Sequence, residues 1–129
     1  DVEIIADPEQ LKRVIDNIIG NSVKYMDKEH GLINIRIKDV GDFIQVEIED
    51  NGKGIGQKDL PFIFDRFYRT DASRNSATGG SGIGLSIVKK IIEDHSGKIW
   101  ATSKESTGTV MYFAIRKYQE VPNEQNIDN

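Results

Sequence analysis

The chain has 129 residues, of which 37% are hydrophobic, so it is long enough to bury the core of one domain but not of two. It contains no cysteine, which excludes disulfide bonds, thiolate metal sites and a cysteine nucleophile. Its net charge of −4 argues against nonspecific binding to nucleic acid, and its longest apolar run, six residues at 110–115, is too short to cross a bilayer. The sequence shows no basic, apolar leader, and we expect a soluble cytoplasmic domain.

A helix is predicted to begin at Pro8. Asp7 is a typical N-cap residue, proline is favoured at the first helical position, and Gln10 stands where a capping-box glutamine bonds back to the cap. The apolar residues that follow have the spacing of one buried helical stripe: Leu11, Val14, Ile15, Ile18, Ile19 and Val23. Residues 2–5 are compatible with a short strand, and we expect that an initial strand of the domain is missing from the chain.

Two runs of alternating apolar and polar residues follow, at 33–38 and 44–49. A turn at Gly41-Asp42 separates them. The pattern predicts an antiparallel hairpin with one solvated face.

A second helix is predicted from residue 83 to 95, because apolar residues again recur at helical spacing and a glycine follows. Two further strands are predicted near 98–103 and 109–116. Elements in this order indicate an α+β fold, a two-layer α/β sandwich whose mixed, mainly antiparallel sheet is covered on one face by helices. We assign the domain to residues 1–118 and expect the polar tail, 119–129, to be disordered.

The segment between the hairpin and the second helix has neither period. Seven of the twelve glycines lie between Gly52 and Gly84, and residues 70–78 are polar except for alanine. A long polar loop in a compact domain is usually functional or disordered. We therefore look for the functional site here and predict a mobile lid at residues 70–80.

Asn17, Asn21 and Lys24 share one face of the first helix, away from the centre of its apolar stripe. Asparagine is a mediocre helix former, and an ordinary solvated face is the simplest interpretation of the pair. Amide oxygens are also ligands for magnesium, whose coordination shell phosphates can complete. The pattern by itself leaves both interpretations open.

Two glycine-rich motifs are candidates for nucleotide contacts. The run from Asp50 to Gly54 is either a capped turn or a place where Asp50 accepts a hydrogen bond from a base amino group while the backbone approaches the ring. The run from Gly79 to Gly84 leads into a helix, so its unshielded amides favour phosphate binding over a simple hinge. Neither run has the spacing of a P-loop or of a dinucleotide-binding fingerprint.

Three arginines lie in or beside the polar loop: Arg66, Arg69 and Arg74. Singly, each is most simply a solvated surface residue. ATP carries negative charge, however, and an acidic domain needs a local positive site to bind it. Lys24, Arg69, Arg74, magnesium and a helix N-terminus could supply that site.

Together the motifs make the sequence similar to the catalytic, ATP-binding domain of bacterial sensor histidine kinases, within the GHKL ATPase group. The resemblance covers residues 2–116. Four boxes of this family occur in order: the N box at 16–25, a first glycine box at 50–55, the F box at 63–69 and a second glycine box at 80–85. Each box is weak alone, but four at these separations are specific.

The resemblance implies roles for the matching residues. Asn21 would hold magnesium, and Asn17 would orient phosphates or water beside it. Lys24 would reach a phosphate, and Tyr25 would lie against the nucleotide. Arg69 would reach the γ-phosphate and would complete the catalytic set with the two asparagines.

On the base side, the resemblance implies that Asp50 accepts the adenine amino proton and that Gly54 lies beside the base. The other implied nucleotide contacts belong to the two glycine boxes and the lid: Gly52, Ile55, Arg74, Gly80, Ser81, Gly82, Ile83, Gly84 and Leu85. Phe64 and Phe67 would anchor the lid. Ser81 stands where many members of the family have threonine.

The implied function is to bind Mg-ATP and donate the γ-phosphate to a histidine on a separate domain. Neither His30 nor His95 is followed by the acid and arginine of the family's phosphoacceptor motif, so the chain alone is not expected to autophosphorylate. One alternative is a GHKL ATP hydrolase or an anti-sigma-type serine kinase, which carry a glutamate as general base where this chain has Asn17. Another is a nonenzymatic nucleotide-binding module.

The expected cofactors are ATP and Mg²⁺. The expected partners are the phosphoacceptor histidine domain of the same parent protein and, indirectly, a response regulator, with no nucleic acid and no direct membrane insertion. We expect the isolated domain to be a monomer and its parent a homodimer. The domain would be the cytoplasmic part of a protein anchored in the cell membrane.

Overall fold

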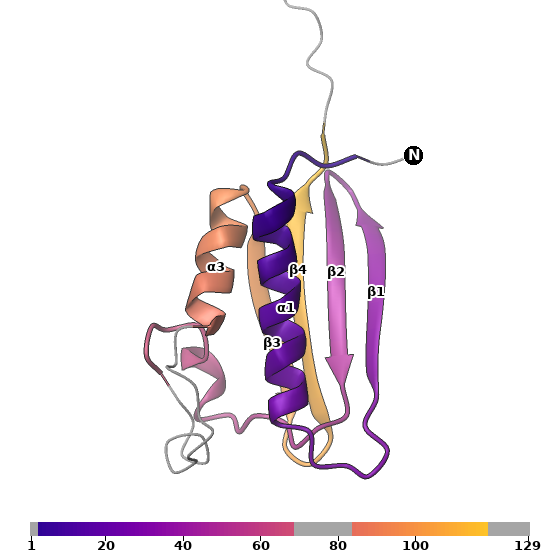
Figure 1. The fold of residues 1–129 in the computed structure, drawn as a ribbon, viewed down its shortest axis with the longest axis vertical. Helices are drawn as coiled ribbons and strands as arrows, with labels where there is room; N and C mark the ends of the chain where they lie inside the picture. The colour runs from indigo at the N-terminus through magenta and orange to yellow at the C-terminus, as the bar shows by residue number, and fades with distance from the viewer. Residues whose placement is uncertain (1–2, 69–83, 119–129) are drawn as a thin grey trace, which may run out of the picture.

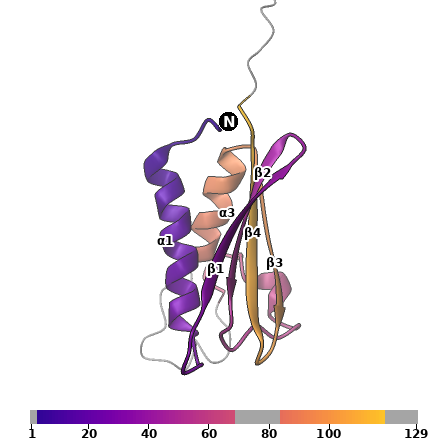
Figure 2. The same ribbon diagram turned by 90° about the vertical axis from the view of Figure 1, so that its right-hand side faces the viewer.

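The computed structural model describes residues 3–68 and 84–118. Its elements are α1 (Pro8–Lys24), β1 (Ile33–Val40), β2 (Phe43–Asp50), the 3-10 helix η1 (Leu60–Phe62), α3 (Gly84–Asp94), β3 (Lys98–Lys104) and β4 (Gly108–Arg116). The strands form one sheet in the order β1-β2-β4-β3. Both helices lie on one face of the sheet, which confirms the two-layer α+β fold (Figure 1, Figure 2). The expected mixed sheet is antiparallel at every pairing of the described strands.

Helix α1 begins where predicted, and the side chain of Asp7 accepts hydrogen bonds from the amides of Glu9 and Gln10 at 3.0 and 3.3 Å. The capping-box prediction is wrong in its second half. The Asp7 N–H donates instead to Nε2 of His95, at 3.1 Å, and Oε1 of Gln10 is buried with no hydrogen-bond partner in the described part of the chain. Nδ1 of His95 lies 2.7 Å from the Ile91 carbonyl and donates to it, so the neutral ring fastens the end of α3 to the start of α1.

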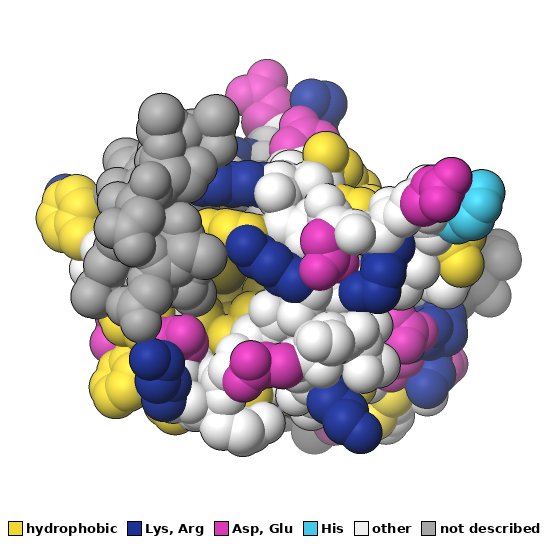
Figure 3. Space-filling model, turned by 90° about the horizontal axis from the view of Figure 1, so that it is seen from below, with side chains coloured by type: hydrophobic (Ala, Val, Ile, Leu, Met, Phe, Trp, Pro, Cys, Tyr) yellow, Lys and Arg dark blue, Asp and Glu magenta, His cyan; other side chains and the backbone are white. Residues whose placement is uncertain are grey.

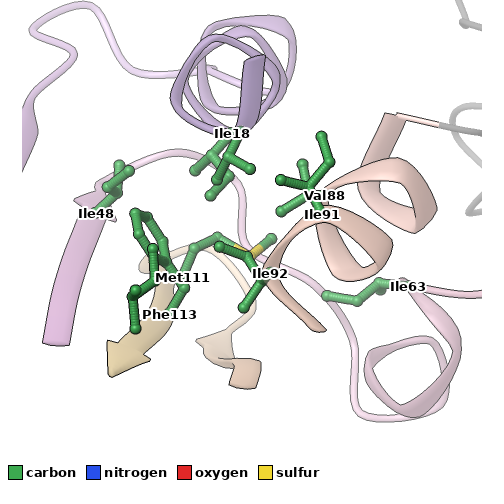
Figure 4. Close-up of a cluster of buried hydrophobic side chains, with 10 residues drawn as sticks. Ile18, Ile48, Ile63, Val88, Ile91, Ile92, Met111 and Phe113 are labelled. Carbon is green, nitrogen blue, oxygen red and sulfur yellow. The ribbon is translucent and has the colours of Figure 1, made fainter. Parts of the chain in front are cut away.

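The hydrophobic core lies between the two helices and strands β2 and β4 (Figure 4). Its buried side chains are Val14, Ile18, Ile48, Ile63, Val88, Ile91, Ile92, Met111, Phe113 and Ile115. Val23, assigned to the buried stripe by its spacing, is 61% exposed, and Ser22 is buried in its place. The buried line of α1 advances by four residues, from 14 to 18 to 22, and position 23 lies about 100° further around the helix. Within the described ranges, no helix is long and apolar enough to span a bilayer.

The predicted hairpin is confirmed, but on β1 the apolar face is covered only at its start, where Ile33 packs against the core. Ile35 stands opposite the buried Ile48 and so points toward the helices, yet it is 52% exposed. Ile37, two residues further along the same face, is 71% exposed. Strand β1 is the edge strand, and α1 lies over β2 and β4 rather than over β1 (Figure 1). Alternation predicts which face is apolar but not how far the helix layer extends.

Glu47 lies on the sheet face that is turned away from the helices, and its side chain is nevertheless only 5% exposed. Two cations and an amide cover it. Nε of Arg36 lies 2.9 Å from Oε1, while Nζ of Lys38 and Nε2 of Gln45 lie 3.2 and 2.8 Å from Oε2. The hydrogen bond from Arg36, and after it the one from Gln45, lowers the pKa of Glu47 from 4.5 to about 2.

This lowered pKa predicts a pH-dependent stability. The folded state holds the charged form of Glu47 more strongly than the unfolded chain does, so the stabilisation is present above pH 4.5 and is lost as the pH falls from there through about 2. We expect Glu47→Gln to lower the melting temperature at pH 7 and to lower it progressively less between these two pH values. Glu49→Gln is the control, because Glu49 is half-exposed and pairs with the other end of Arg36. A Glu47→Gln difference that does not change with pH would contradict the prediction.

Candidate functional site

The predicted site residues that the structure describes lie at one end of the domain. The C-terminal ends of α1 and β2, the turn between β3 and β4, and the start of α3 meet there (Figure 1). Seen from this end, the surface is hollowed, with hydrophobic side chains on the floor and Lys and Arg side chains on the rim (Figure 3). The predicted lid at 70–80, the tail at 119–129 and several expected contacts lie outside the described residues: Arg69, Arg74, Gly80, Ser81, Gly82 and Ile83.

The polar face of α1 meets the start of α3 at Asn17. The Asn17 side-chain NH₂ donates to the Arg13 carbonyl at 2.8 Å, which turns its oxygen away from the helix. That oxygen lies 3.4 Å from the position that a Cβ on Gly84 would occupy. Asn21 follows one turn later on the same face and is half-buried. The structure therefore places the Asn17 amide beside the start of α3, an end of a helix where an anion is favoured, with Asn21 one turn further along α1.

The amide oxygens of Asn17 and Asn21 suit a metal ion whose remaining ligands are phosphate oxygens and water. Within residues 3–68 and 84–118, no group of three or more His, Asp or Glu side chains could hold a metal ion by itself. Magnesium needs few protein ligands when substrate phosphates and water fill the rest of its octahedral shell. An amide oxygen of Asn21 is a suitable hard ligand for it.

The expected base side of the site begins at Asp50, the last residue of β2. Its Oδ1 accepts a hydrogen bond from the Gly52 amide at 2.9 Å, and its second carboxylate oxygen can accept from a base amino group. Gly52 is buried, and a Cβ there would stand 2.8 Å from the Tyr25 carbonyl. The Lys53 amide donates to that same carbonyl at 3.2 Å. The loop after β2 thus lies directly against the end of α1.

Two lysines lie against the ring of Tyr25. Nζ of Lys24 is 5.3 Å and Nζ of Lys53 is 4.8 Å from the ring centroid. Such cation–π contacts hold positive charge at this end of an acidic chain. Lys24 was predicted as a site residue, whereas Lys53 was not, because a lysine in an exposed glycine turn usually has no partner but solvent.

The loop 51–56 is seated on the turn between β3 and β4. Gly54 has a positive φ of +75°, and a Cβ on it would stand 2.2 Å from the Lys104 carbonyl oxygen. The Ser106 amide donates to the Lys53 carbonyl at 2.7 Å, and the Ile55 amide donates to Oγ of Ser103 at 2.7 Å. No motif in the sequence pointed to the turn residues, because their contacts join segments about 50 residues apart.

Ile55 and Leu85, two further expected nucleotide contacts, are partly buried and pack against the core. As apolar side chains, they can offer a nucleotide a hydrophobic surface but no polar contact. In the F box, Phe64 also packs against the core, whereas Phe67 is 60% exposed and has a φ of +66°, unusual for a residue with a side chain. Of the two predicted anchors, only Phe64 is anchored within the described residues.

An antiparallel sheet with helices on one face and polar loops gathered at one end is the architecture expected of a GHKL-type ATP-binding domain. The family described as histidine kinase-, DNA gyrase B-, and HSP90-like ATPase matches residues 6–119. The chain belongs to this family.

Its similar relatives are sensor kinases. The chain is 36% identical over 121 residues to the sensor histidine kinase WalK of Bacillus subtilis (strain 168), which covers 93% of this chain and 20% of that protein. It is 39% identical over 110 residues to the sensor protein kinase WalK of Staphylococcus haemolyticus. That match covers 84% of this chain and 18% of that protein. The chain thus spans about a fifth of the length of these curated relatives.

Solved structures agree. The catalytic domain of histidine kinase ThkA is 35% identical with a TM-score of 0.72, and the match covers 88% of this chain and 70% of that one. The mycobacterial sensor histidine kinase MprB has the same fold, with a TM-score of 0.79 and 24% identity. The match covers 92% of this chain and 80% of that one. Within its family, the chain is an ATP-binding catalytic domain of the two-component sensor histidine kinase type.

Proposed function

We propose that this domain binds Mg-ATP and donates the γ-phosphate to a histidine on a separate dimerisation and phosphoacceptor domain of the same parent protein. The observation that carries the proposal is the position of Asn17, whose amide oxygen faces Gly84 at the start of α3. Phosphates held at that helix start would lie within reach of the amide side chains of α1. A Mg²⁺ ion bound by Asn21 would neutralise phosphate charge there.

The residue at position 17 favours transfer to an external nucleophile over hydrolysis. An amide cannot take a proton from water, and the neighbouring Asp16 is exposed and paired with Lys12 at 2.9 Å. An imidazole acceptor is itself a competent nucleophile, so phosphoryl transfer needs mainly positioning and charge neutralisation. In the proposed arrangement, neither of these needs a general base.

The acceptor belongs on another domain. Both ring nitrogens of His95 are engaged in hydrogen bonds, with the Asp7 amide and the Ile91 carbonyl, so this histidine is not available for phosphorylation. We propose that the parent is a membrane-anchored homodimer that passes the phosphate on to a response regulator. The catalytic domain would extend over residues 1–118.

The remaining nucleotide contacts are proposed on the family resemblance. Lys24 would neutralise phosphate charge, and Tyr25 would lie against the nucleotide. Arg69 would reach the γ-phosphate, with Arg74 beside it. The backbone amides from Gly80 to Gly84 would wrap the phosphate chain.

Removing the amide of Asn21 should weaken ATP binding mainly through magnesium. Asn21→Ala removes a metal ligand but no core contact, so we expect the domain to stay folded and the affinity gain from magnesium to fall by about tenfold, as for one lost charge-assisted contact. Calorimetric titration with ATP in the presence of magnesium and of EDTA measures this gain. Asn34→Ala, an exposed amide on β1, is the matched control. A full magnesium gain in Asn21→Ala would remove this residue from the metal site.

Phosphotransfer is tested with γ-labelled ATP. The chain alone should remain unlabelled and release little phosphate, because it lacks both an acceptor and a base. Adding the phosphoacceptor domain of the parent kinase as a separate protein should give an acid-labile label on that domain, although weakly, since the effective concentration of the tether is lost. Acid-labile label on this chain, or steady phosphate release that survives Asn17→Ala, would contradict the proposal.

A further inference from the structure

Ser103, in β3, has a hydroxyl whose hydrogen-bonding capacity is completely used. Its Oγ accepts the Ile55 N–H at 2.7 Å, donates to the Gly108 carbonyl at 2.9 Å and lies 2.7 Å from the hydroxyl of Thr109. A serine hydroxyl has one proton and two acceptor sites. Because the proton goes to Gly108, the Thr109 hydroxyl must donate to Ser103. One oxygen in β3 therefore joins the loop after β2 to the first two residues of β4.

The segments that Ser103 joins also touch on both sides of Asp50. Gly54 lies over the Lys104 carbonyl without space for a side chain. Gly108, with a φ of +137°, would place a Cβ 2.0 Å from the carbonyl oxygen of Asp50 itself. The backbone on either side of the Asp50 carboxylate is therefore packed against the β3–β4 turn. Of the contacts between loop and turn described above, the one from Ser103 Oγ to the Ile55 amide is made by a side chain and can be removed without a steric conflict.

We propose that Ser103 is a positioning residue for base recognition. Its hydroxyl holds the Ile55 amide, and through it the loop 51–56, in the place where Asp50 and Gly54 meet the base. This inference rests on the proposed binding of ATP and adds to it a residue outside the four sequence boxes. In this arrangement Ser103 does not touch the nucleotide, and it acts by limiting the positions that the loop can take.

Three variants test the proposal in the whole chain. Ser103→Ala removes the hydroxyl and leaves the Ile55 amide without its acceptor. Ser103→Thr keeps the hydroxyl. Thr102→Val is the matched control, because the neighbouring hydroxyl of Thr102 lies on the other face of β3 and contacts the Tyr112 hydroxyl at 3.2 Å.

Calorimetric titration with ATP and GTP, and amide hydrogen exchange at Ile55, are the measurements. We expect Ser103→Ala to lower the affinity for ATP by about tenfold, as for one lost buried hydrogen bond, and to lower the preference for ATP over GTP. The increase in ATP affinity on adding magnesium should not change, since the phosphate side of the site is intact. Exchange of the Ile55 amide should accelerate. Ser103→Thr should have the ATP affinity and the ATP-over-GTP preference of the unsubstituted chain, and so should Thr102→Val.

A merely structural role would lower the melting temperature without changing the ATP-to-GTP ratio, and that result overturns the proposal. If Ser103→Ala does not fold, Ser103→Cys replaces it, because a thiol has a similar size and is a weak acceptor. An unchanged ratio in Ser103→Cys would overturn the proposal in the same way. Failure of the unsubstituted chain to bind ATP would instead refute the proposed function.

Discussion

Replacing Asp50 with alanine is expected to weaken ATP binding by about 1.5–3 kcal/mol, or roughly 10- to 150-fold in Kd, and to remove most of the preference for ATP over GTP. The carboxylate stands at the end of β2, where Oδ1 is used by the Gly52 amide and the second oxygen is left for the base. Adenine presents an amino group at the position where guanine presents a carbonyl oxygen. A carboxylate attracts the first and repels the second, so the preference depends on this side chain.

The alanine variant also removes the acceptor of the Gly52 amide, so loosening of the loop could contribute to the loss. Asp50→Asn separates the two effects, because its amide oxygen can still accept from Gly52 while the charge is gone. We expect an intermediate loss of affinity for Asp50→Asn. Asp39→Ala, an exposed carboxylate at the far end of the hairpin that pairs with Lys117, is the control. Unchanged affinity and an unchanged ATP-to-GTP ratio in Asp50→Ala would remove Asp50 from the base site.

Local patterns predicted the elements of the fold well, because each of them depends on neighbours in the chain. The start of α1 follows from Asp7 and Pro8, and the turn of the hairpin follows from Gly41. The placement of the expected site residues on α1 and β2 is local in the same sense. Asn17 and Asn21 share a helix face whatever the helix packs against, and Asp50 ends a strand that alternation already defined.

Features that depend on contacts between distant segments were not predictable in this way. The capping partner of Asp7 is His95, 88 residues away, although a suitable glutamine stands three positions after the cap. Ile35 and Ile37 have the correct alternation, but their exposure depends on where α1 crosses the sheet. Ser103 looks like any polar residue of a strand, and its importance emerges only when the loop 51–56 is seen to rest on it.

Two glycines with similar backbone conformations should differ sharply when each is replaced by alanine. Gly41, in the hairpin turn, has a φ of +61°, and no atom of the described residues lies within 4 Å of the Cβ position. Gly54 has a φ of +75° and the Lys104 carbonyl oxygen 2.2 Å from that position. Gly41→Ala should therefore cost only the left-handed conformation, about 1–2 kcal/mol in the free energy of unfolding.

Gly54→Ala should cost the same conformational term and, in addition, the displacement of backbone against backbone, about 1–3 kcal/mol more. Neither the loop nor the β3–β4 turn can relieve the contact by rotating a side chain, so the loop that carries the proposed base contacts must move. We expect Gly54→Ala to bind no ATP at ATP concentrations that saturate the unsubstituted chain. Gly41→Ala should bind ATP normally. Urea unfolding compares the free energies of unfolding of the two variants, and calorimetric titration of the folded variants compares their ATP affinities. Equal stabilities together with equal ATP affinities would mean that the loop after β2 is not held in place by the β3–β4 turn.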